Sequence, residues 1–190
     1  MKRLAIFDFD GTLINTFEPI KGKVAWEKYY NKLYPHVGWW GRKESLDTKV
    51  FDIKPFPKVL AQLELNKTIV DTKVIILTSR REKLRLYVEK ILNNNNIIVD
   101  DIILKRGNET KGDVILKIVD YNHDLEEIVV FDDFMNRDAE KISEYTKINN
   151  LLPLNIKYEL FYVNSDNISP LIGDGVISFD TTNKLLNTIV

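Results

Sequence analysis

Four short apolar runs constrain what this chain can fold into more than any other feature. They occupy residues 4–7, 74–77, 102–104 and 128–131, and longer segments with helical periodicity lie between them. Runs that are apolar at nearly every position are typical of strands that helices cover on both faces. Their alternation with helical segments predicts an α/β fold, in which a mainly parallel sheet is flanked by helices.

The segments between these runs indicate the domain organisation. Apolar residues recur at helical spacing over 84–92 and 114–119, and a third helix is expected from about Met135 to Ile148. Residues 14–56 interrupt this alternation of strands and helices. They contain a short helix near 23–33 and an aromatic, turn-rich stretch, which indicates a small cap-like insertion after the first strand. With one more strand at 156–163, we expect a core over 1–165. We expect residues 166–190 to be a C-terminal tail that packs on the core or is partly flexible.

The composition excludes several classes of function. The 190 residues fit one domain, and the absence of cysteine excludes disulfides, thiolate zinc sites and cysteine nucleophiles and suits a reducing compartment. The 27 basic residues balance 28 acidic ones, so no overall field draws the protein to nucleic acid or to an anionic membrane. No apolar run approaches the roughly 20 residues of a membrane span. We therefore expect a soluble cytoplasmic protein that binds no membrane.

Polar residues gather where the predicted strands end. In an open α/β sheet, ligands bind at the carboxyl ends of the strands, so side chains from distant parts of the sequence converge there. The residues expected at this edge are Asp8, Asp10, Thr78, Ser79, Lys111, Asp132 and Asp133. Carboxylates packed together repel one another without a cation, and their hard oxygen ligands favour Mg²⁺. The sequence therefore predicts a Mg²⁺ site formed by Asp8, Asp10, Asp132 and Asp133. The alternative for the last two is a plain loop pair.

The spacing of Asp8 and Asp10 suits phosphoryl chemistry. Asp8, the first acid beyond a buried strand, can attack phosphorus and form an aspartyl-phosphate. Asp10 can protonate the leaving oxygen and later take the proton from the attacking water. Gly11 lets the chain turn sharply and bring backbone N–H groups near the phosphate. The alternative is a pair of strand-end acids that only caps a turn.

Two further residues complete the predicted catalytic set. Thr78 can donate a hydroxyl hydrogen bond to a phosphoryl oxygen, and Lys111 can offset developing negative charge. The run from Thr110 to Asp113 has the form of a capping box, which places Lys111 in the first turn of a helix whose N-terminus also favours an anion. The residues expected to bind the substrate are Gly11, Thr12, Ser79 and Arg80.

These assignments leave alternatives open. Lys111 would be a solvated helix residue if Lys105 took its place, and a one-residue shift of the strand end would exchange Thr78 with Ser79. Arg80 begins a basic run, and the usual fate of such a run is a solvated helix face. Its place beside the expected phosphate site favours a role in substrate binding.

The motifs resemble those of the haloacid dehalogenase (HAD) superfamily. The run Asp8-Phe9-Asp10-Gly11-Thr12-Leu13 resembles its first motif, Thr78 its second, Lys111 its third and Asp132-Asp133 its fourth, in order over residues 1 to about 150. The resemblance implies a Rossmann-like sheet, Mg²⁺ dependence and phosphoryl transfer through Asp8. It also implies that Asp133 binds the metal and that Asp132 supports it. The haloacid dehalogenases proper generally lack the second acid of the first motif, so Asp10 points to a phosphatase.

The chain is also similar to the HAD domain of the Swiss Army Knife RNA repair proteins and, more distantly, to the 3′-phosphatase domain of polynucleotide kinases. This similarity rests on Leu77-Thr78-Ser79-Arg80, Trp39-Trp40 after Gly38, Leu104-Lys105, Thr110-Lys111 and the acidic pair. Those domains usually have Gly at the position of Ser79, and often Arg soon after the acidic pair, where this chain has Phe134 and only later Arg137. For Trp39 and Trp40, the core of the insertion is a better interpretation than a platform on which a base stacks.

Together these features predict a Mg²⁺-dependent phosphomonoester hydrolase whose substrate is a nucleic-acid end or a nucleotide. The small insertion and the short stretch between Arg80 and Lys111 leave no room for a large lid, so the crevice would admit a bulky ester. The alternatives are a HAD phosphatase for small metabolites and a catalytically inactive, phosphate-binding interaction module.

Overall fold

A six-stranded sheet forms the centre of the molecule. The computed structural model describes residues 1–133 and 138–173. The strand order is β3-β2-β1-β4-β5-β6, with β1 to β5 parallel and β6 antiparallel to β5. The strands are β1 (Arg3–Phe7), β2 (Thr72–Arg81), β3 (Asp101–Lys105), β4 (Glu127–Asp132), β5 (Lys157–Asn164) and β6 (Asn167–Ile172). The predicted α/β, Rossmann-like fold with a mainly parallel sheet is confirmed.

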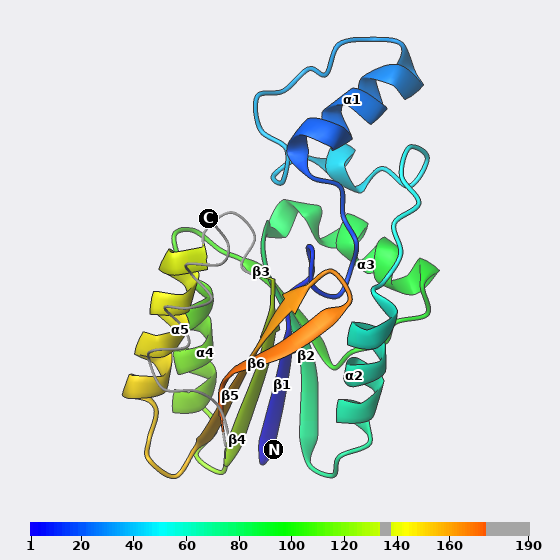
Figure 1. Ribbon diagram of the computed structural model, residues 1–190. Helices are drawn as coiled ribbons and strands as arrows, with labels where there is room; N and C mark the ends of the chain where they lie inside the picture. Colours follow the sequence, from blue (N-terminus) through cyan, green and yellow to red (C-terminus); the bar gives the residue numbers. More distant parts are fainter. Residues whose placement is uncertain (134–137, 174–190) are drawn as a thin grey trace.

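Helices cover both faces of this sheet (Figure 1). Helices α4 (Lys111–Asp120) and α5 (Asp138–Leu151) lie on one face, and α2 (Pro57–Lys67) and α3 (Arg85–Asn94) lie on the other. Helix α1 (Pro19–Tyr30) lies beyond the carboxyl ends of the strands, and short 3₁₀ helices span Lys43–Leu46 and Glu82–Leu84. Successive strand residues belong to different core clusters because side chains alternate between the two faces. Within the described residues, no helix has the length and apolar character needed to cross a membrane.

Most of the predicted elements are present, with shifted boundaries. The first four strands, the strand at 156–163, and helices α3 and α4 lie where they were expected. Helix α1 begins earlier than predicted, at Pro19, because proline suits the first turn of a helix. Helix α5 starts at Asp138, and Met135, where we expected a start, lies outside the described residues.

Besides the short 3₁₀ helices, one α-helix and one strand were not predicted from the sequence. Helix α2 buries Val59, Leu63 and Asn66 at helical spacing, directly after the expected insertion. Strand β6 forms a hairpin with β5 and contains Pro170, which argues against a strand when the sequence is interpreted alone. Within the expected tail, residues 167–172 thus extend the sheet and Leu171 is buried, whereas residues 174–190 lie outside the described part.

An aromatic stack fixes the three neighbouring strands β1, β4 and β5 relative to one another. The ring of Phe131 on β4 stacks on Phe7 of β1 at 4.5 Å and on Phe161 of β5 at 4.9 Å, between ring centroids. Each such contact contributes about 0.5–1.5 kcal/mol beyond the burial of its area. Phe7 and Phe131 immediately precede the acidic residues of the first and fourth motifs. The stack therefore holds the two strand ends that carry those acids.

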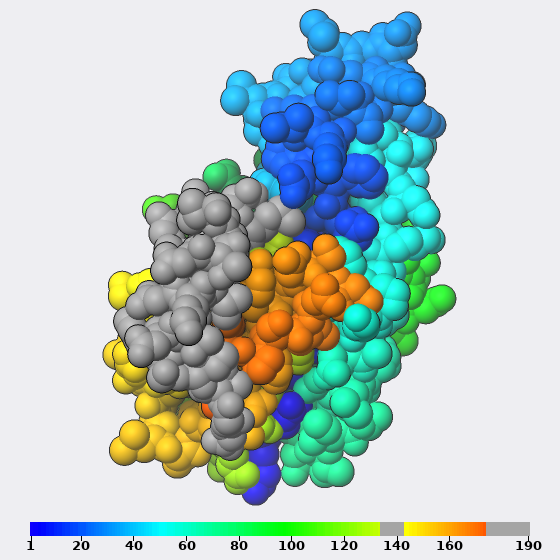
Figure 2. Space-filling model, viewed as in Figure 1, coloured from blue at the N-terminus to red at the C-terminus, as the bar shows by residue number. Residues whose placement is uncertain are grey.

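The insertion has its own small core around Trp39. This indole is 3% exposed, and its Nε1 donates a hydrogen bond to the Phe17 carbonyl at 2.7 Å. Gly22 of α1 lies so close that an added Cβ would be 2.2 Å from the Trp39 ring, so only glycine fits there. The space-filling view shows the insertion as a lobe beyond the sheet (Figure 2). The preferred interpretation of Trp39 as core of the insertion is confirmed.

Candidate active site

The first acid lies at the point where β1 leaves the sheet. The Asp8 backbone N–H still bonds the Phe131 carbonyl at 2.9 Å, as a continuation of the pairing between β1 and β4. The chain then turns back, and the Ile14 N–H bonds the Phe9 carbonyl at 2.9 Å. Gly11 sits in this turn with φ +69°, a left-handed conformation that costs other residues energy. The glycine predicted to turn the chain after Asp8 therefore does so.

Three carboxylates meet at the ends of β1 and β4. Asp8, Asp132 and Asp133 are all buried, and one carboxylate oxygen of each lies within 4.8 Å of the others. Asp132 ends β4, so parallel pairing with β1 brings it beside Asp8. Hard carboxylate oxygens are the ligands that Mg²⁺ prefers, and this donor set contains no softer ligand. The three residues therefore fit a divalent cation of the Mg²⁺ type.

Lys111 lies between two of these acids. Its Nζ is 2.7 Å from Asp8 Oδ1 and 2.6 Å from Asp132 Oδ2. Burial alone would lower the pKa of Lys111, but the negative charges of Asp132 and Asp8 outweigh that effect and raise the pKa well above its ordinary value. The ammonium is therefore charged at neutral pH. The predicted capping box between Thr110 and Asp113 is present and makes Lys111 the first residue of α4.

Lys105, the alternative to Lys111, is exposed at the end of the edge strand β3. The geometry therefore brings Lys111, and not Lys105, into contact with the acids of the first and fourth motifs.

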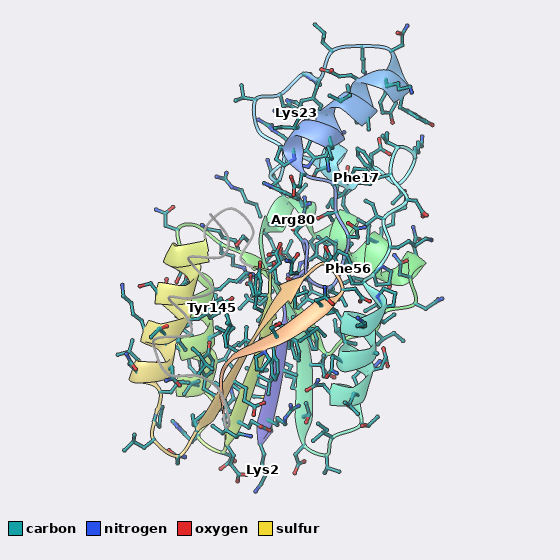
Figure 3. The ribbon with its side chains drawn as sticks, in the orientation of Figure 1. Lys2, Phe17, Lys23, Phe56, Arg80 and Tyr145 are labelled. Carbon is teal, nitrogen blue, oxygen red and sulfur yellow. The ribbon has the colours of Figure 1, made fainter. Side chains whose placement is uncertain are left out.

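Tyr145 of α5 also binds the acid cluster, and sequence reasoning missed it. Its hydroxyl donates a hydrogen bond to Asp132 Oδ2 at 2.7 Å, and the side chain is 2% exposed (Figure 3). Burial, together with the negative charge of Asp132, raises the pKa of Tyr145 well above its ordinary value, so the hydroxyl remains a donor. No motif in the sequence marks this tyrosine, because it looks like any core position of an amphipathic helix.

Asp10 belongs to a second charged cluster, centred on Arg80. Arg80 Nε lies 3.1 and 2.8 Å from the two oxygens of Asp10, and Arg80 Nη2 lies 2.7 Å from Oδ1. The Thr16 hydroxyl donates to the same Oδ1 at 2.9 Å. The guanidinium thus binds the Asp10 carboxylate through two nitrogens, which fixes the orientation of the carboxylate and balances its charge. Asp10 is not among the carboxylates that meet Asp8 within the described residues, so its predicted role as a metal ligand stays a prediction.

Arg80 also joins the sheet to the insertion. Its Nη1 donates to the Trp40 carbonyl at 2.9 Å and to Ser45 Oγ at 2.8 Å, and its guanidinium lies 5.6 Å from the centroid of the Trp40 ring. The register of β2 against β3 shifts between Thr78 and Arg81, an irregularity of the kind that redirects side chains at the ends of strands. In Figure 3 Arg80 lies where the sheet meets the insertion. The sequence predicted Arg80 to bind substrate, and the observed contacts of its guanidinium are with the protein.

The remaining predicted site residues differ in exposure. Thr78 is buried in β2, where its Oγ1 accepts a hydrogen bond from the Arg80 backbone N–H at 3.2 Å, whereas Ser79 is exposed. Thr12 is fully buried in the turn after Asp8, and its Oγ1 has no hydrogen-bond partner in the part of the chain that the structure describes. Thr78 and Thr12 thus lie near the motif residues, and their contacts with a substrate remain predictions.

Comparison with known proteins gives few matches. No family model and no curated protein sequence matches the chain. Among solved structures, it is similar to a chain of the Pnkp1/Rnl/Hen1 RNA repair complex, with a TM-score of 0.50 and 18% identity over 87% of this chain and 43% of that chain. It is also similar to the HAD domain of the effector protein Lem4 from Legionella pneumophila, with a TM-score of 0.47 and 17% identity over 98% and 94% of the two chains. This chain therefore spans less than half the length of the RNA repair chain.

The first of these similarities bears on the fold alone, and it accords with the strand order described above. The chain has a mainly parallel, Rossmann-like α/β fold. In this fold the acids that resemble the first and fourth motifs come from adjacent parallel strands, and Lys111 comes from the start of a helix on one face of the sheet. Residues Phe134 and Arg137, where the chain departs from the RNA repair pattern, lie outside the described residues.

Proposed function

We propose that this protein is a Mg²⁺-dependent phosphomonoester hydrolase in which Asp8 is the nucleophile. The observation that carries the proposal is the cluster in which Lys111 Nζ contacts Asp8 and Asp132 while Asp133 lies within reach of both acids. A single structural ion pair needs one carboxylate and one cation. Three buried carboxylates around one ammonium, at the strand edge where α/β folds bind ligands, instead suit a site for a cation and a phosphate.

The residues divide the reaction between them. An Asp8 oxygen attacks phosphorus, the bond from phosphorus to the ester oxygen breaks, and Asp10 in its protonated form supplies the proton that the leaving alcohol needs. Asp10 then takes a proton from water as the water attacks the aspartyl-phosphate, which releases phosphate and restores Asp8. Arg80 and Thr16 support this role, because they hold the carboxylate of Asp10 in one orientation.

Lys111 offsets the negative charge on the phosphoryl group. Its ammonium can shift from the Asp8 oxygen toward a phosphoryl oxygen without losing Asp132, its second partner. Asp8, Asp132 and Asp133 would hold Mg²⁺. When bound, this ion supplies charge neutralisation for the phosphoryl oxygens and for the acids themselves. Thr78 would donate its hydroxyl to a phosphoryl oxygen, as predicted from the sequence.

The enzymatic proposal is tested by Asp8→Asn. This change keeps the shape of the side chain and removes its nucleophilic oxygen, so release of phosphate from an aryl phosphate in the presence of Mg²⁺ should fall to background. The matched control is Asp120→Asn, at an exposed position at the end of α4, which should retain full activity. Full activity of the Asp8 variant would exclude the mechanism. A wild-type protein that hydrolyses no ester with Mg²⁺ would favour the inactive binding module.

For the substrate we propose a nucleic-acid end or a nucleotide. The insertion is small, and the segment between Arg80 and Lys111 holds one short 3₁₀ helix, α3 and β3, so this segment supplies no second cap over the acids. Trp40 is half-buried beside Arg80, so part of its ring is open to a base. The similar chain in an RNA repair complex accords with this choice.

The substrate proposal is tested by comparing oligonucleotides phosphorylated at the 3′ or 5′ end with mononucleotides and sugar phosphates. We expect kcat/KM to be highest for one class of nucleic-acid end. Replacing Trp40 with Leu should lower this preference by about 5- to 150-fold, equivalent to about 1–3 kcal/mol for one stacked base, and leave the aryl phosphate rate nearly unchanged. Equal rates for all substrates, or a preference for small sugar phosphates, would reject the nucleic-acid assignment.

A further inference from the structure

A hollow of about 430 Å³ lies away from the acidic site, between β3 and α4. Its apolar lining includes Ile103 of β3 and Val114 and Ile118 of α4, and Tyr121 at its rim is 85% exposed. Strand β3 stands at one end of the strand order, and in residues 1–133 and 138–173 no strand pairs with its outer edge. An apolar hollow thus adjoins an open strand edge, a combination that suits the docking of another strand.

The two edges of the sheet differ in whether they block such pairing. Strand β6, at the far edge, contains Pro170, which lacks the N–H that a neighbouring strand would need. Strand β3 contains no proline, and the apolar residues Ile102, Ile103 and Leu104 follow one another in its centre. Charged residues flank this centre, as they do at many protected edges. Their order, however, makes this edge complementary to itself.

Two acids precede the apolar centre of β3 and two bases follow it. Asp100 and Asp101 stand at one end and Lys105 and Arg106 at the other, and all four residues are exposed. If two copies of β3 pair in antiparallel fashion about Ile103, Asp101 of each copy faces Lys105 of the other. Parallel pairing in register would place like charges side by side, which is unfavourable.

The same arrangement brings the apolar groups together. About the two-fold axis Ile103 faces its own copy, and Ile102 faces Leu104. Because side chains alternate along a strand, Asp101, Ile103 and Lys105 share one face, the face on which the hollow lies. The hollows of the two copies therefore adjoin, and a two-fold contact of this kind closes and does not continue into a filament.

We propose that the chain forms a two-fold dimer by antiparallel pairing of the edge strand β3, and that the second copy covers the hollow between β3 and α4. Opposite charges across the strands select this register, and the apolar residues of β3 and α4 supply the buried area. This assignment does not depend on the proposed hydrolase activity, because no residue of the acidic site takes part in the contact.

Charge reversal tests the pairing. In sedimentation equilibrium the wild-type chain should associate as a dimer, whereas Asp101→Lys and Lys105→Asp should each raise the dissociation constant by about tenfold or more, because each places two like-charged pairs across the strands. An equimolar mixture of the two variants should dimerise again, because the mixed pair restores opposite charges at both positions. The double variant D101K/K105D should also recover. A monomeric wild type at every concentration up to its solubility limit, or no recovery in the mixture, would overturn the proposal.

A cross-link gives a second measurement that does not depend on charge. The chain contains no cysteine, so Ile103→Cys places a single thiol on the expected two-fold axis. Facing residues of antiparallel strands lie about 4.5–5.5 Å apart between Cα atoms, which permits a disulfide. Mild oxidation should convert most of this variant to a covalent dimer, while Ile98→Cys, at an exposed position before the strand, should stay largely monomeric. Equal cross-linking of both variants would contradict a contact centred on β3.

Discussion

The site consists of two charged clusters that use different cations for different purposes. In the first, the Lys111 ammonium contacts single oxygens of Asp8 and Asp132. In the second, the Arg80 guanidinium binds Asp10 through two nitrogens and uses the third for the Trp40 carbonyl and Ser45. A lysine is a point charge that can move between acceptors, whereas an arginine fork fixes the geometry of what it binds. The first cluster is therefore suited to a cation that moves between acceptors during a reaction, and the second to fixing the orientation of Asp10 and the position of the insertion.

The largest expected effect comes from removing the mobile charge. Lys111→Met should lower kcat by about 10²–10³-fold, because one electrostatic contact to the reacting group is lost. The free energy of unfolding in the absence of metal should fall by about 3–5 kcal/mol, since Asp8 and Asp132 lose a buried partner. Phosphate release and chemical denaturation measure the two effects. Lys117→Met, an exposed change on the same helix, serves as the control and should alter neither quantity appreciably. A Lys111 variant with the wild-type rate would show that the Lys111 ammonium does not offset charge on the reacting group.

Arg80→Lys should lower kcat less than Lys111→Met does, and it should also loosen the contact between the sheet and the insertion. A lysine keeps the charge but cannot contact Asp10, Trp40 and Ser45 together, so a misplaced Asp10 should lower kcat by about 10²-fold. Hydrogen exchange should become faster in residues 39–46, which Arg80 joins to the sheet, and remain unchanged in β4. The neighbouring exposed Arg81→Lys provides a matched control. If the rate falls through KM alone, with exchange unchanged, Arg80 binds substrate as the sequence first predicted.

Metal binding distinguishes the roles of the two clusters, and it can be measured without a catalytic assay. Mg²⁺ at about 100 times its dissociation constant should stabilise the folded protein by about 2.7 kcal/mol, which is seen as a rise in Tm that EDTA reverses. Asp133→Asn should remove most of this rise, because Asp133 is one of the three clustered carboxylates. Asp10→Asn should keep it, because the Asp10 side chain lies in the Arg80 cluster. Loss of the rise in the Asp10 variant would instead support the role of this side chain as a metal ligand.

The sequence predicted one cluster better than the other, for a physical reason. Asp8, Lys111, Asp132 and Asp133 stand at strand ends or a helix start, and parallel strands bring such positions together whatever the details of packing. The contacts of Arg80 depend on a local irregularity in β2 and on the path of the insertion. Neither property leaves a periodic signal in the sequence.

The same distinction holds for the fold as a whole. The buried strands were predicted because their apolar runs carry a strong signal, whereas β6 gains its stability from its hairpin with β5 and was missed. Ser45 and Thr16 are ordinary polar residues until the fold places them beside Arg80 and Asp10. Their roles follow from tertiary contacts and not from any local pattern.

The smallest expected effect concerns Tyr145, a residue that only the structure identified. Tyr145→Phe removes the hydrogen bond to Asp132 Oδ2, which leaves Lys111 as the remaining identified donor to that oxygen. A hydrogen bond to a charged group contributes about 1.5–3 kcal/mol, and we expect most of that loss in the free energy of unfolding and only a several-fold fall in kcat. Tyr158→Phe is the matched control, because Tyr158 is also buried but its hydroxyl has no hydrogen-bond partner among the described residues. That variant should be as stable as the wild type or slightly more so. Equal losses in the two variants would mean that removing any buried hydroxyl lowers the stability by this amount, and that the bond from Tyr145 to Asp132 adds nothing to the first cluster.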